Sequence, residues 1–331
     1  MTRPAVLVAR QVFAQTLERL SAHFEVEANP ADQIFTPAEL SARLRGKAGA
    51  FITGSERIDA AVLDAHPQLR AVCNMAVGYN NIDVDACTAR GVLATNTPDV
   101  LTETTADFGF ALMMATARRI AESEHFLRRG EWTKWAYDMF TGSDVHGATL
   151  GILGMGRIGQ GIARRGALGF GMRVIYHNRT RLAAEVEAPI KAQWVDKATL
   201  LREADHLVLV VPYSPASHHT IGAVELAQMK PTATLTNIAR GGIVDDAALA
   251  EALRERRIAA AGLDVFEGEP AVHPALLTVP NVVLTPHIAS ATVATRRAMA
   301  ELAADNLIAA LTGGVPPTPI NPAVLSSKVR R

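Results

Sequence analysis

Short apolar runs alternate with amphipathic segments along the first hundred residues of this chain. Three of the runs have the length of a β-strand, at residues 5–9, 49–53 and 70–74. A helical pattern covers residues 11–23, and the sequence Thr-Pro-Ala-Glu at 36–39 is typical of a helix start with Thr as the cap. This alternation predicts a small α/β domain over residues 1–99.

From residue 147 onward, apolar runs of strand length recur with helical patterns between them. The six runs cover residues 149–153, 173–177, 206–211, 234–238, 260–265 and 282–285. They predict a doubly wound parallel sheet of the Rossmann type in a domain spanning residues 100–286. A long helical pattern at 291–311 follows, and we expect it to return to the first domain. Residues 287–331 then complete that domain, a flavodoxin-like α/β unit into which the Rossmann domain is inserted.

A polar segment with two tryptophans precedes the first Rossmann strand. It follows a helical pattern over residues 103–120, whose small side chains favour close packing. We interpret residues 120–146 as a projecting arm that forms a homodimer contact. An ordinary surface helix is the alternative.

The first Rossmann strand runs directly into three glycines, Gly154, Gly156 and Gly159, which open a helical pattern. This spacing suits a dinucleotide pyrophosphate. The first glycine permits the tight turn, the second lets the backbone approach the phosphates, and the third lets the helix pack on the sheet. The predicted contacts of the dinucleotide in this turn are Gly154, Met155, Gly156, Arg157, Ile158 and Gly159.

The end of the second Rossmann strand indicates which dinucleotide is preferred. NAD sites usually carry an acid about 20 residues after the glycines, where it binds the ribose 2′-hydroxyl. No carboxylate lies between Gly154 and Arg181, and the strand is followed by Asn178, Arg179 and Thr180. Because guanidinium groups bind phosphate, we predict NADP(H) in preference to NAD(H), with Arg179 as the principal 2′-phosphate contact beside Asn178 and Thr180. The alternative is that these arginines belong to a solvated loop.

The composition argues against several classes of protein. The 331 residues include 33 Lys and Arg against 33 Asp and Glu, so no net charge favours nucleic acid or an anionic membrane as a partner. No apolar run approaches the ~20 residues of a membrane span. Only Cys73 and Cys87 are present, too few for a disulfide framework, and we expect a cytoplasmic protein.

Three segments at the carboxyl ends of predicted strands carry side chains suited to catalysis, since ligands of open α/β sheets bind at that edge. Arg240 precedes two glycines and suits a substrate carboxylate, although an arginine that caps a strand has the same pattern. The loop 264–270 holds three carboxylates, one of which could orient a base; a solvated acidic turn is the alternative. His287 follows the last strand, where a lone histidine is more often structural.

These residue types together indicate one kind of chemistry. Hydride transfer to a ketone needs a proton donor, and histidine is suited to that role near neutral pH. A carboxylate beside the imidazole fixes its tautomer, and a guanidinium binds the substrate acid and polarises its carbonyl. The combination predicts reduction of a 2-oxo acid.

The remaining histidines do not indicate a metal site. His218 and His219 lie in a loop without a carboxylate or cysteine at ligand spacing. The histidines that stand alone are His125, His146, His177 and His206. We therefore predict no metal.

Four stretches together are specific for one family of enzymes. They are residues 151–159, 237–242, 261–270 and 286–292. Through them the chain resembles the D-isomer-specific 2-hydroxyacid dehydrogenases over nearly its full length, and within that family the glyoxylate/hydroxypyruvate reductases and 2-ketogluconate reductases. The resemblance implies that Arg240, Glu269 and His287 are catalytic, Glu269 being the acid directly before a proline.

The resemblance also implies further contacts. The loop 76–80 resembles the family loop whose amides hold the substrate carboxylate, so Val77 and Gly78 are expected there, together with Ser290. Asn178, in place of the usual Asp, matches NADP-preferring members. The additional cofactor contacts that it implies are Thr105, Val211, Pro212, Ile238, Ala239, Asp264 and His287.

The implied mechanism is hydride transfer from NADPH to the 2-oxo carbon of glyoxylate, hydroxypyruvate or 2-ketogluconate. His287, paired with Glu269, protonates the alkoxide, and the product is the D-2-hydroxy acid. A short-chain dehydrogenase is excluded, because none of the four tyrosines has a lysine four residues on. The alternative from another class is a nucleotide-sensing corepressor of the same fold.

Overall fold

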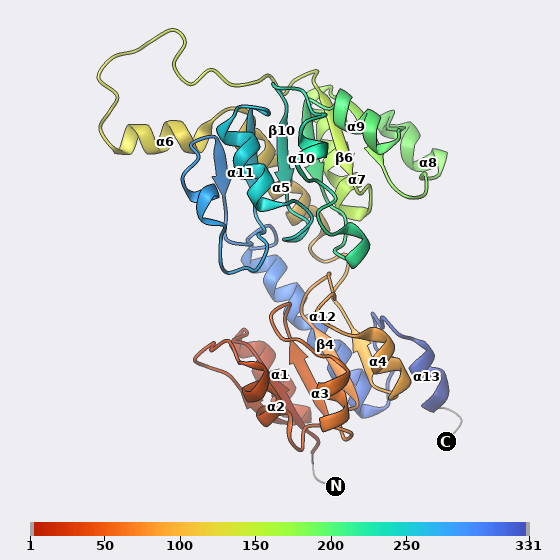
Figure 1. Ribbon diagram of the computed structural model, residues 1–331. Helices are drawn as coiled ribbons and strands as arrows, with labels where there is room; N and C mark the ends of the chain where they lie inside the picture. Colours follow the sequence, from red (N-terminus) through yellow and green to blue (C-terminus); the bar gives the residue numbers. More distant parts are fainter. Residues whose placement is uncertain (1–2, 329–331) are drawn as a thin grey trace. The chain divides into compact units, whose positions relative to one another are not determined.

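The structure is a computed structural model that describes residues 3–328 of the chain. It consists of two compact units (Figure 1). The small unit is formed by the chain up to Leu101 and again from Thr292 onward, and the large unit by Thr102–Ala291. The large unit is therefore an insertion in the sequence of the small one.

Five parallel strands form the sheet of the small unit. Their spatial order is β2 (Glu25–Ala28), β1 (Ala5–Val8), β3 (Gly49–Ile52), β4 (Ala71–Asn74) and β5 (Leu93–Thr95). The order 2-1-3-4-5 is that of flavodoxin-like folds. The central strands β3 and β4 are buried along their whole length, as expected of parallel strands that are covered on both faces.

Helices cover both faces of this sheet. One face packs against α1 (Ala14–His23) and α12 (Val293–Thr312), with Leu20 and Leu307 in the shared core. The helices on the other face are α2 (Pro37–Leu44), α3 (Ala60–Ala65) and α4 (Val84–Ala89). The short helix α13 (Ala323–Lys328) ends the described chain.

The predicted helix start at Thr36 is confirmed. The Thr36 hydroxyl accepts from the Glu39 amide at 3.3 Å, and the Glu39 carboxylate accepts from the Thr36 amide at 2.8 Å. The helix predicted at 11–23 begins only at Ala14, because Phe13 is still extended. Strands β2 and β5 were not predicted, since one carries two glutamates and the other is three residues long.

Seven parallel strands form the sheet of the large unit. Their spatial order is β12 (Val282–Leu284), β11 (Ala260–Leu263), β10 (Thr234–Asn237), β9 (His206–Leu209), β6 (Thr149–Leu153), β7 (Arg173–His177) and β8 (Gln193–Trp194). The sequence predicted six of them and missed β8, which has only two residues and lies at the edge. The chain winds from β6 toward β7 on one side and toward β9 on the other. The point between β6 and β9 is therefore where a doubly wound sheet binds its ligand.

Helices also cover both faces of the large sheet. One face packs against α5 (Thr102–Ala117) and α7 (Arg157–Arg164), and α7 continues as a π-helical turn over Arg165–Gly169. The helices associated with the other face are α9 (Lys197–Glu203), α10 (Ala223–Leu226) and α11 (Asp246–Arg254). The helical pattern expected at the glycine turn thus begins at Arg157. The short helical segments are α8 (Ala184–Glu187) and the 3-10 turns Ala188–Ile190, Pro215–Ser217 and Pro274–Leu277.

The segment that we interpret as an arm is only partly helical. The helix predicted at 103–120 ends at Ala117, because Arg119 adopts a left-handed conformation with φ 53°. A new helix, α6 (Ile120–Arg128), then begins. Figure 1 shows α6 and the long loop after it extending from the large unit before the chain reaches β6.

These observations confirm the predicted fold class, a Rossmann-type sheet inserted into a flavodoxin-like α/β domain. The second junction lies later than the predicted boundary before His287. Residues 287–291 belong to the large unit, because the Ile288 and Ala289 amides donate to Asp264 after β11. Of the helices in the described part of the chain, none combines the length and the apolar character needed to cross a membrane.

Candidate active site

The glycine-rich turn lies directly after β6, at the switch point of the large sheet. Gly154 has φ 102°, and a side chain there would meet the backbone of Val210 and Val211 at 2.8 Å. A side chain at Gly159 would overlap the Gly154 carbonyl, so α7 packs against the turn itself. At Gly156, by contrast, no atom lies within 4 Å of where a side chain would begin. The space in front of α7 is therefore open to a ligand.

Two observations show that this turn fits a dinucleotide. Gly156 is the N-cap of α7, and as a glycine it has no side chain with which to cap the helix. The N–H groups at a helix start bind anions such as a pyrophosphate. The second observation is Thr105 on α5, which packs against α7: its hydroxyl is buried and has no hydrogen-bond partner among the described residues. An unpartnered buried hydroxyl is expected where a ligand completes the site.

The loop after β7 is tied to the glycine turn by Asn178. The Met155 amide donates to Asn178 Oδ1 at 2.7 Å, and Trp194 Nε1 donates to the Asn178 carbonyl at 3.0 Å. The residue that stands where NAD sites usually carry an acid thus holds the loop in place.

The two arginines of this loop differ in their surroundings. Arg181 forms an ion pair with Glu187 at 2.7 Å, and Glu187 also accepts from the buried Tyr176 hydroxyl at 2.6 Å. These partners raise the pKa of Arg181 and lower that of Glu187. Arg179, beside the exposed Thr180, is exposed and has no ion-pair or hydrogen-bond partner in the described range. Of the two arginines that the sequence offers for binding a phosphate, only Arg179 is without a protein partner among the described residues.

The other residues expected at the cofactor follow neighbouring strands of the same sheet. Because all these strands are parallel, their carboxyl ends lie at one edge. Val211 and Pro212 follow β9, Ile238 and Ala239 follow β10, and Asp264 follows β11.

Arg240 lies in a turn that Asn237 closes. Asn237 Oδ1 accepts from the Ala239 amide at 3.0 Å, and Asn237 Nδ2 donates to the Arg240 carbonyl at 3.2 Å. Burial lowers the pKa of Arg240, and the negative charge of Glu269 opposes that shift. Since a guanidinium stays protonated in proteins, Arg240 is a poorly solvated cation that gains by binding an anion.

The glycine after Arg240 brings together two loops that carry predicted catalytic residues. A side chain at Gly241 would overlap the carbonyl of Phe266, so the two backbones lie in direct contact. Phe266 is in the loop that carries Glu269. Glycine at 241 therefore lets the arginine loop and the glutamate loop lie side by side.

Asp264 fixes the turn that carries His287. Its carboxylate is fully buried, and burial raises the pKa of Asp264 above its ordinary value. The donors to this carboxylate are Thr285 Oγ1 at 2.7 Å, the Ile288 amide at 2.8 Å and the Ala289 amide at 2.9 Å. These bonds hold His287 in a left-handed conformation with φ 54°. The resemblance pointed only to a cofactor contact for Asp264, and the structure adds this anchoring role.

His287 and Glu269 form a pair. His287 Nδ1 lies 2.9 Å from Glu269 Oε1, and because a carboxylate accepts, Nδ1 carries the proton of this bond. The two side chains are 46% and 33% exposed, so a ligand can reach them. Ser290 is in the same turn and is partly buried. The structure thus joins two of the three predicted catalytic groups directly and places the third, Arg240, within the electrostatic influence of Glu269.

Val77 and Gly78 follow β4 in the small unit. Asn96 Nδ2 donates to the Val77 carbonyl at 2.8 Å, and Asn74 Nδ2 donates to the Gly78 carbonyl at 3.0 Å. In a trans peptide the N–H points opposite to the carbonyl. Asn96 therefore fixes the direction of the Gly78 amide, and Asn74 that of the Tyr79 amide. The Val77 amide shares its peptide with the Ala76 carbonyl, which accepts from the Thr97 amide at 2.9 Å.

Sequence reasoning missed one cluster of polar side chains in the large unit. His218 and His219 have no carboxylate near them in sequence, but the fold places Glu267 beside both. His219 Nε2 lies 2.8 Å from Glu267 Oε2. No sequence spacing signals this contact, because the partners are 48 residues apart.

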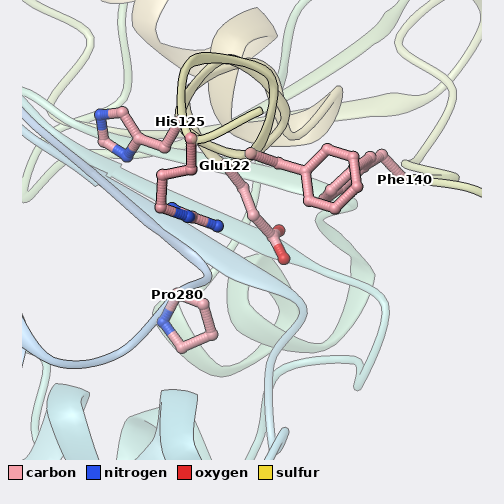
Figure 2. Close-up of a pocket in the computed structure, with 6 residues that line it drawn as sticks. Glu122, His125, Phe140 and Pro280 are labelled. Carbon is pink, nitrogen blue, oxygen red and sulfur yellow. The ribbon is translucent and has the colours of Figure 1, made fainter. Parts of the chain in front are cut away.

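A separate hollow lies on the arm (Figure 2). Its wall includes the Phe126 and Phe140 rings, whose centroids are 5.1 Å apart in an edge-to-face arrangement. The residues that line it are Glu122, His125, Phe126, Arg129, Phe140 and Pro280. None of them belongs to the predicted catalytic or cofactor residues.

Comparison with known proteins identifies the family. The family model described as "D-isomer specific 2-hydroxyacid dehydrogenase, NAD binding domain" matches residues 110–289. A glyoxylate reductase from Thermococcus onnurineus is 50% identical over 328 residues, 98% of each chain. An NADPH-dependent glyoxylate/hydroxypyruvate reductase from Sinorhizobium meliloti, solved with NADP and malonate, has a TM-score of 0.85 and 38% identity. The match covers 98% of each chain.

A third relative is a glyoxylate reductase from Paecilomyes thermophila, with a TM-score of 0.86 and 33% identity over 97% of this chain and 99% of that one. The fold and these matches define a dinucleotide-binding oxidoreductase. The chain belongs to the D-isomer specific 2-hydroxyacid dehydrogenase family, as its motifs predicted.

Proposed function

We propose that this protein is an NADPH-dependent reductase that converts a small 2-oxo acid into the D-2-hydroxy acid. The candidate substrates are glyoxylate, hydroxypyruvate and 2-ketogluconate. The observation that carries the proposal is the 2.9 Å contact between His287 Nδ1 and Glu269 Oε1, which prepares an imidazole for proton transfer. Two of the relatives described above are named glyoxylate reductases, which supports the same substrate class.

Each catalytic side chain has a role that follows from its surroundings. NADPH, when bound, supplies a hydride to the carbonyl carbon. His287 gives a proton to the carbonyl oxygen through Nε2, while Glu269 holds Nδ1 and stabilises the cationic ring before transfer. Arg240 binds the substrate carboxylate and polarises the carbonyl, since burial lowers the pKa of this cation and an anionic ligand would stabilise its charge.

The backbone of the small unit is also expected to contact the substrate. The Val77 and Gly78 amides bind the substrate carboxylate. Their direction is supported by the bond of the Ala76 carbonyl to the Thr97 amide and of the Val77 carbonyl to Asn96, because each carbonyl shares a peptide with one of these amides. Ser290 contacts the substrate from the turn that carries His287.

The preference for NADPH rests on Arg179. It is the arginine of the loop after β7 that has no partner in the described structure, whereas Arg181 is held by Glu187. A 2′-phosphate would give Arg179 the charge-assisted bonds that it lacks. The open glycine turn holds the pyrophosphate. The Thr105 hydroxyl lines the nicotinamide pocket.

We also propose a homodimer that forms through residues 120–146. Trp132, Trp135 and Tyr137 are 55%, 74% and 90% exposed. Large aromatic side chains gathered on one exposed segment are typical of protein contacts. Sedimentation of the wild type and of Trp135→Glu at matched concentrations tests this: the variant is expected to sediment as the lighter species.

NADPH consumption on a panel of 2-oxo acids tests the proposed function. We expect turnover with glyoxylate, hydroxypyruvate or 2-ketogluconate, and less with NADH in place of NADPH. The matched control is His287→Gln, which keeps the cofactor turn intact. Tight NADPH binding without turnover of any 2-oxo acid would contradict the enzyme and favour the nucleotide-sensing alternative.

A further inference from the structure

Two imidazoles and a carboxylate meet on the surface of the large unit, between the loop after β9 and the loop after β11. Glu267 reaches both histidines: Oε2 lies 2.8 Å from His219 Nε2, and Oε1 lies 3.8 Å from His218 Nε2. The two rings are stacked, with centroids 3.8 Å apart and planes inclined by 21°. One potential ligand atom of each residue lies within 4.8 Å of those of the other two. All three side chains are partly exposed, so an ion from solvent can reach them.

We propose that His218, His219 and Glu267 form a binding site for a divalent transition-metal ion of the zinc type. Zinc bonds to nitrogen and oxygen are about 2.0–2.2 Å long, so ligand atoms around one ion are at most roughly 4.4 Å apart. Because imidazole lone pairs lie in the ring planes, the two stacked rings must rotate before both Nε2 atoms can bind one ion, and exposed side chains are able to do so. Two imidazoles and one carboxylate form a known zinc ligand set, which leaves a fourth position for water. Magnesium prefers oxygen ligands and is not expected here.

The far side of each ring supports this assignment independently. His218 Nδ1 lies 3.3 Å from the Tyr213 hydroxyl, and His219 Nδ1 lies 3.9 Å from Asp245 Oδ2. Histidines that bind a metal through one nitrogen usually direct the other N–H to a carboxylate, a carbonyl or water. Both rings thus turn Nε2 toward Glu267 and Nδ1 toward an oxygen, which is the orientation that two metal-binding imidazoles need.

Backbone hydrogen bonds hold two of the three residues in place without an ion. The His219 amide donates to the Gly242 carbonyl at 2.7 Å, and the Glu267 amide donates to Asp246 Oδ2 at 3.1 Å. Gly242 has φ 76°, and a side chain there would lie 3.0 Å from Tyr213 and 3.2 Å from His218. Glycine at 242 therefore makes room for this cluster.

The site adjoins the two catalytic loops. Gly242 is two residues from Arg240, and Glu267 is two residues from Glu269. His219 lies in the loop after β9 and contacts the arginine loop through Gly242, so an ion bound by His219 and Glu267 would link that loop to the glutamate loop more firmly than their hydrogen bond does. We therefore infer that the ion restrains both loops from outside the reaction site.

Isothermal titration of ZnCl2 into tag-free, chelator-treated protein tests the site. We expect one zinc ion per chain, no binding of MgCl2, and a Co²⁺ complex with the intense visible absorption of a tetrahedral ion. His219→Ala and Glu267→Gln should each weaken zinc binding by at least about tenfold, since loss even of an outer partner commonly has that effect. His125→Ala on α6 is the control and should bind zinc as the wild type does.

A second control separates this site from the catalytic pair. His287→Gln should leave zinc binding unchanged, because His287 is not a ligand of the proposed site. The proposal is overturned if the wild type binds no zinc, if His219→Ala and Glu267→Gln bind it normally, or if only His287→Gln loses it. Thermal unfolding of each variant without metal verifies that the fold is intact, and Glu267→Gln serves alone if His219→Ala does not fold. None of these readouts depends on reductase activity.

Discussion

The turn that carries His287 and the loop that carries Arg179 lie at the same edge of the seven-stranded sheet, yet the chain holds them very differently. Three donors fix the His287 turn to the buried Asp264, and Glu269 holds the imidazole itself. Arg179 is exposed and has no such partner within the described residues. A proton donor has to be in position before the reaction, whereas a cation that binds phosphate receives its partner with the ligand.

The loop after β7 contains one arginine of each kind. Arg181 is paired with Glu187, which also accepts from Tyr176. This pair supports the shape of the loop, and Arg179 is the arginine proposed to bind the 2′-phosphate. We therefore assign catalysis and structural support to the side chains that are held by partners, and cofactor specificity to the exposed Arg179. Substitutions can test this assignment.

The largest effect is expected from His287→Gln. Glutamine cannot deliver a proton at the carbonyl oxygen, so turnover should fall by ~10²–10⁴, the usual contribution of a general acid. NADPH should still bind, as measured by fluorescence, because the glycine turn is unchanged and His287 is one of many expected cofactor contacts. Near-normal turnover would remove His287 from the reaction.

Arg240→Lys should have the next largest effect. Lysine keeps the charge but lacks the planar fork that binds a carboxylate in two places. We expect kcat/KM for the oxo acid to fall by ~10²–10³, in the range seen when one stabilising donor is lost. The matched control, Arg254→Lys on the exposed end of α11, should be neutral. A mild change at Arg240 would argue against bidentate binding.

Arg179→Asp sharpens the comparison at the cofactor. Loss of a charge-assisted bond to a 2′-phosphate should reduce the preference for NADPH over NADH roughly 10- to 100-fold. Arg181→Gln is the control, and the ratio of the two efficiencies should change much less, because Arg181 is engaged by Glu187. Equal effects of the two substitutions would mean that the loop acts only through its net charge.

The smallest effect is expected from Asp264→Asn, which tests the fixed side of the comparison. The amide would direct N–H groups at the Ala289 or Ile288 amide, leaving a buried donor unsatisfied. The free energy of unfolding in urea should fall by about 1–3 kcal/mol. Asp246→Asn is the control, because this buried acid accepts from only one backbone amide outside its helix. It should lower the free energy of unfolding by less than Asp264→Asn does. Unchanged stability of Asp264→Asn would show that the turn does not depend on this carboxylate.

Much of this molecule could be predicted from its sequence because the signals are local. Apolar runs marked β6 and β7 to the residue, and the spacing of Gly154 and Gly159 marked the dinucleotide turn. The edge strand β8 escaped because two residues form no pattern. The backbone contact between Gly241 and Phe266 could not be predicted either, because its only trace in the sequence is the glycine itself.

Partners that are distant in sequence could not be predicted in the same way. The pairing of Arg181 with Glu187 appears only when the chain after β7 turns back, so the sequence overcounted the available cations. The approach of Glu267 to His219 depends on two loops from different strands. Motifs thus indicated the candidate reacting groups, and the fold was needed to show which charges are already paired.

We propose that Glu269 acts in the reaction only by holding His287. A double-mutant cycle of His287→Gln, Glu269→Gln and the double variant, read as single-turnover rates of hydride transfer, is the decisive experiment. We predict that the double variant is no slower than His287→Gln alone, since Glu269 has nothing left to orient. Losses that multiply in the double variant would contradict the pair.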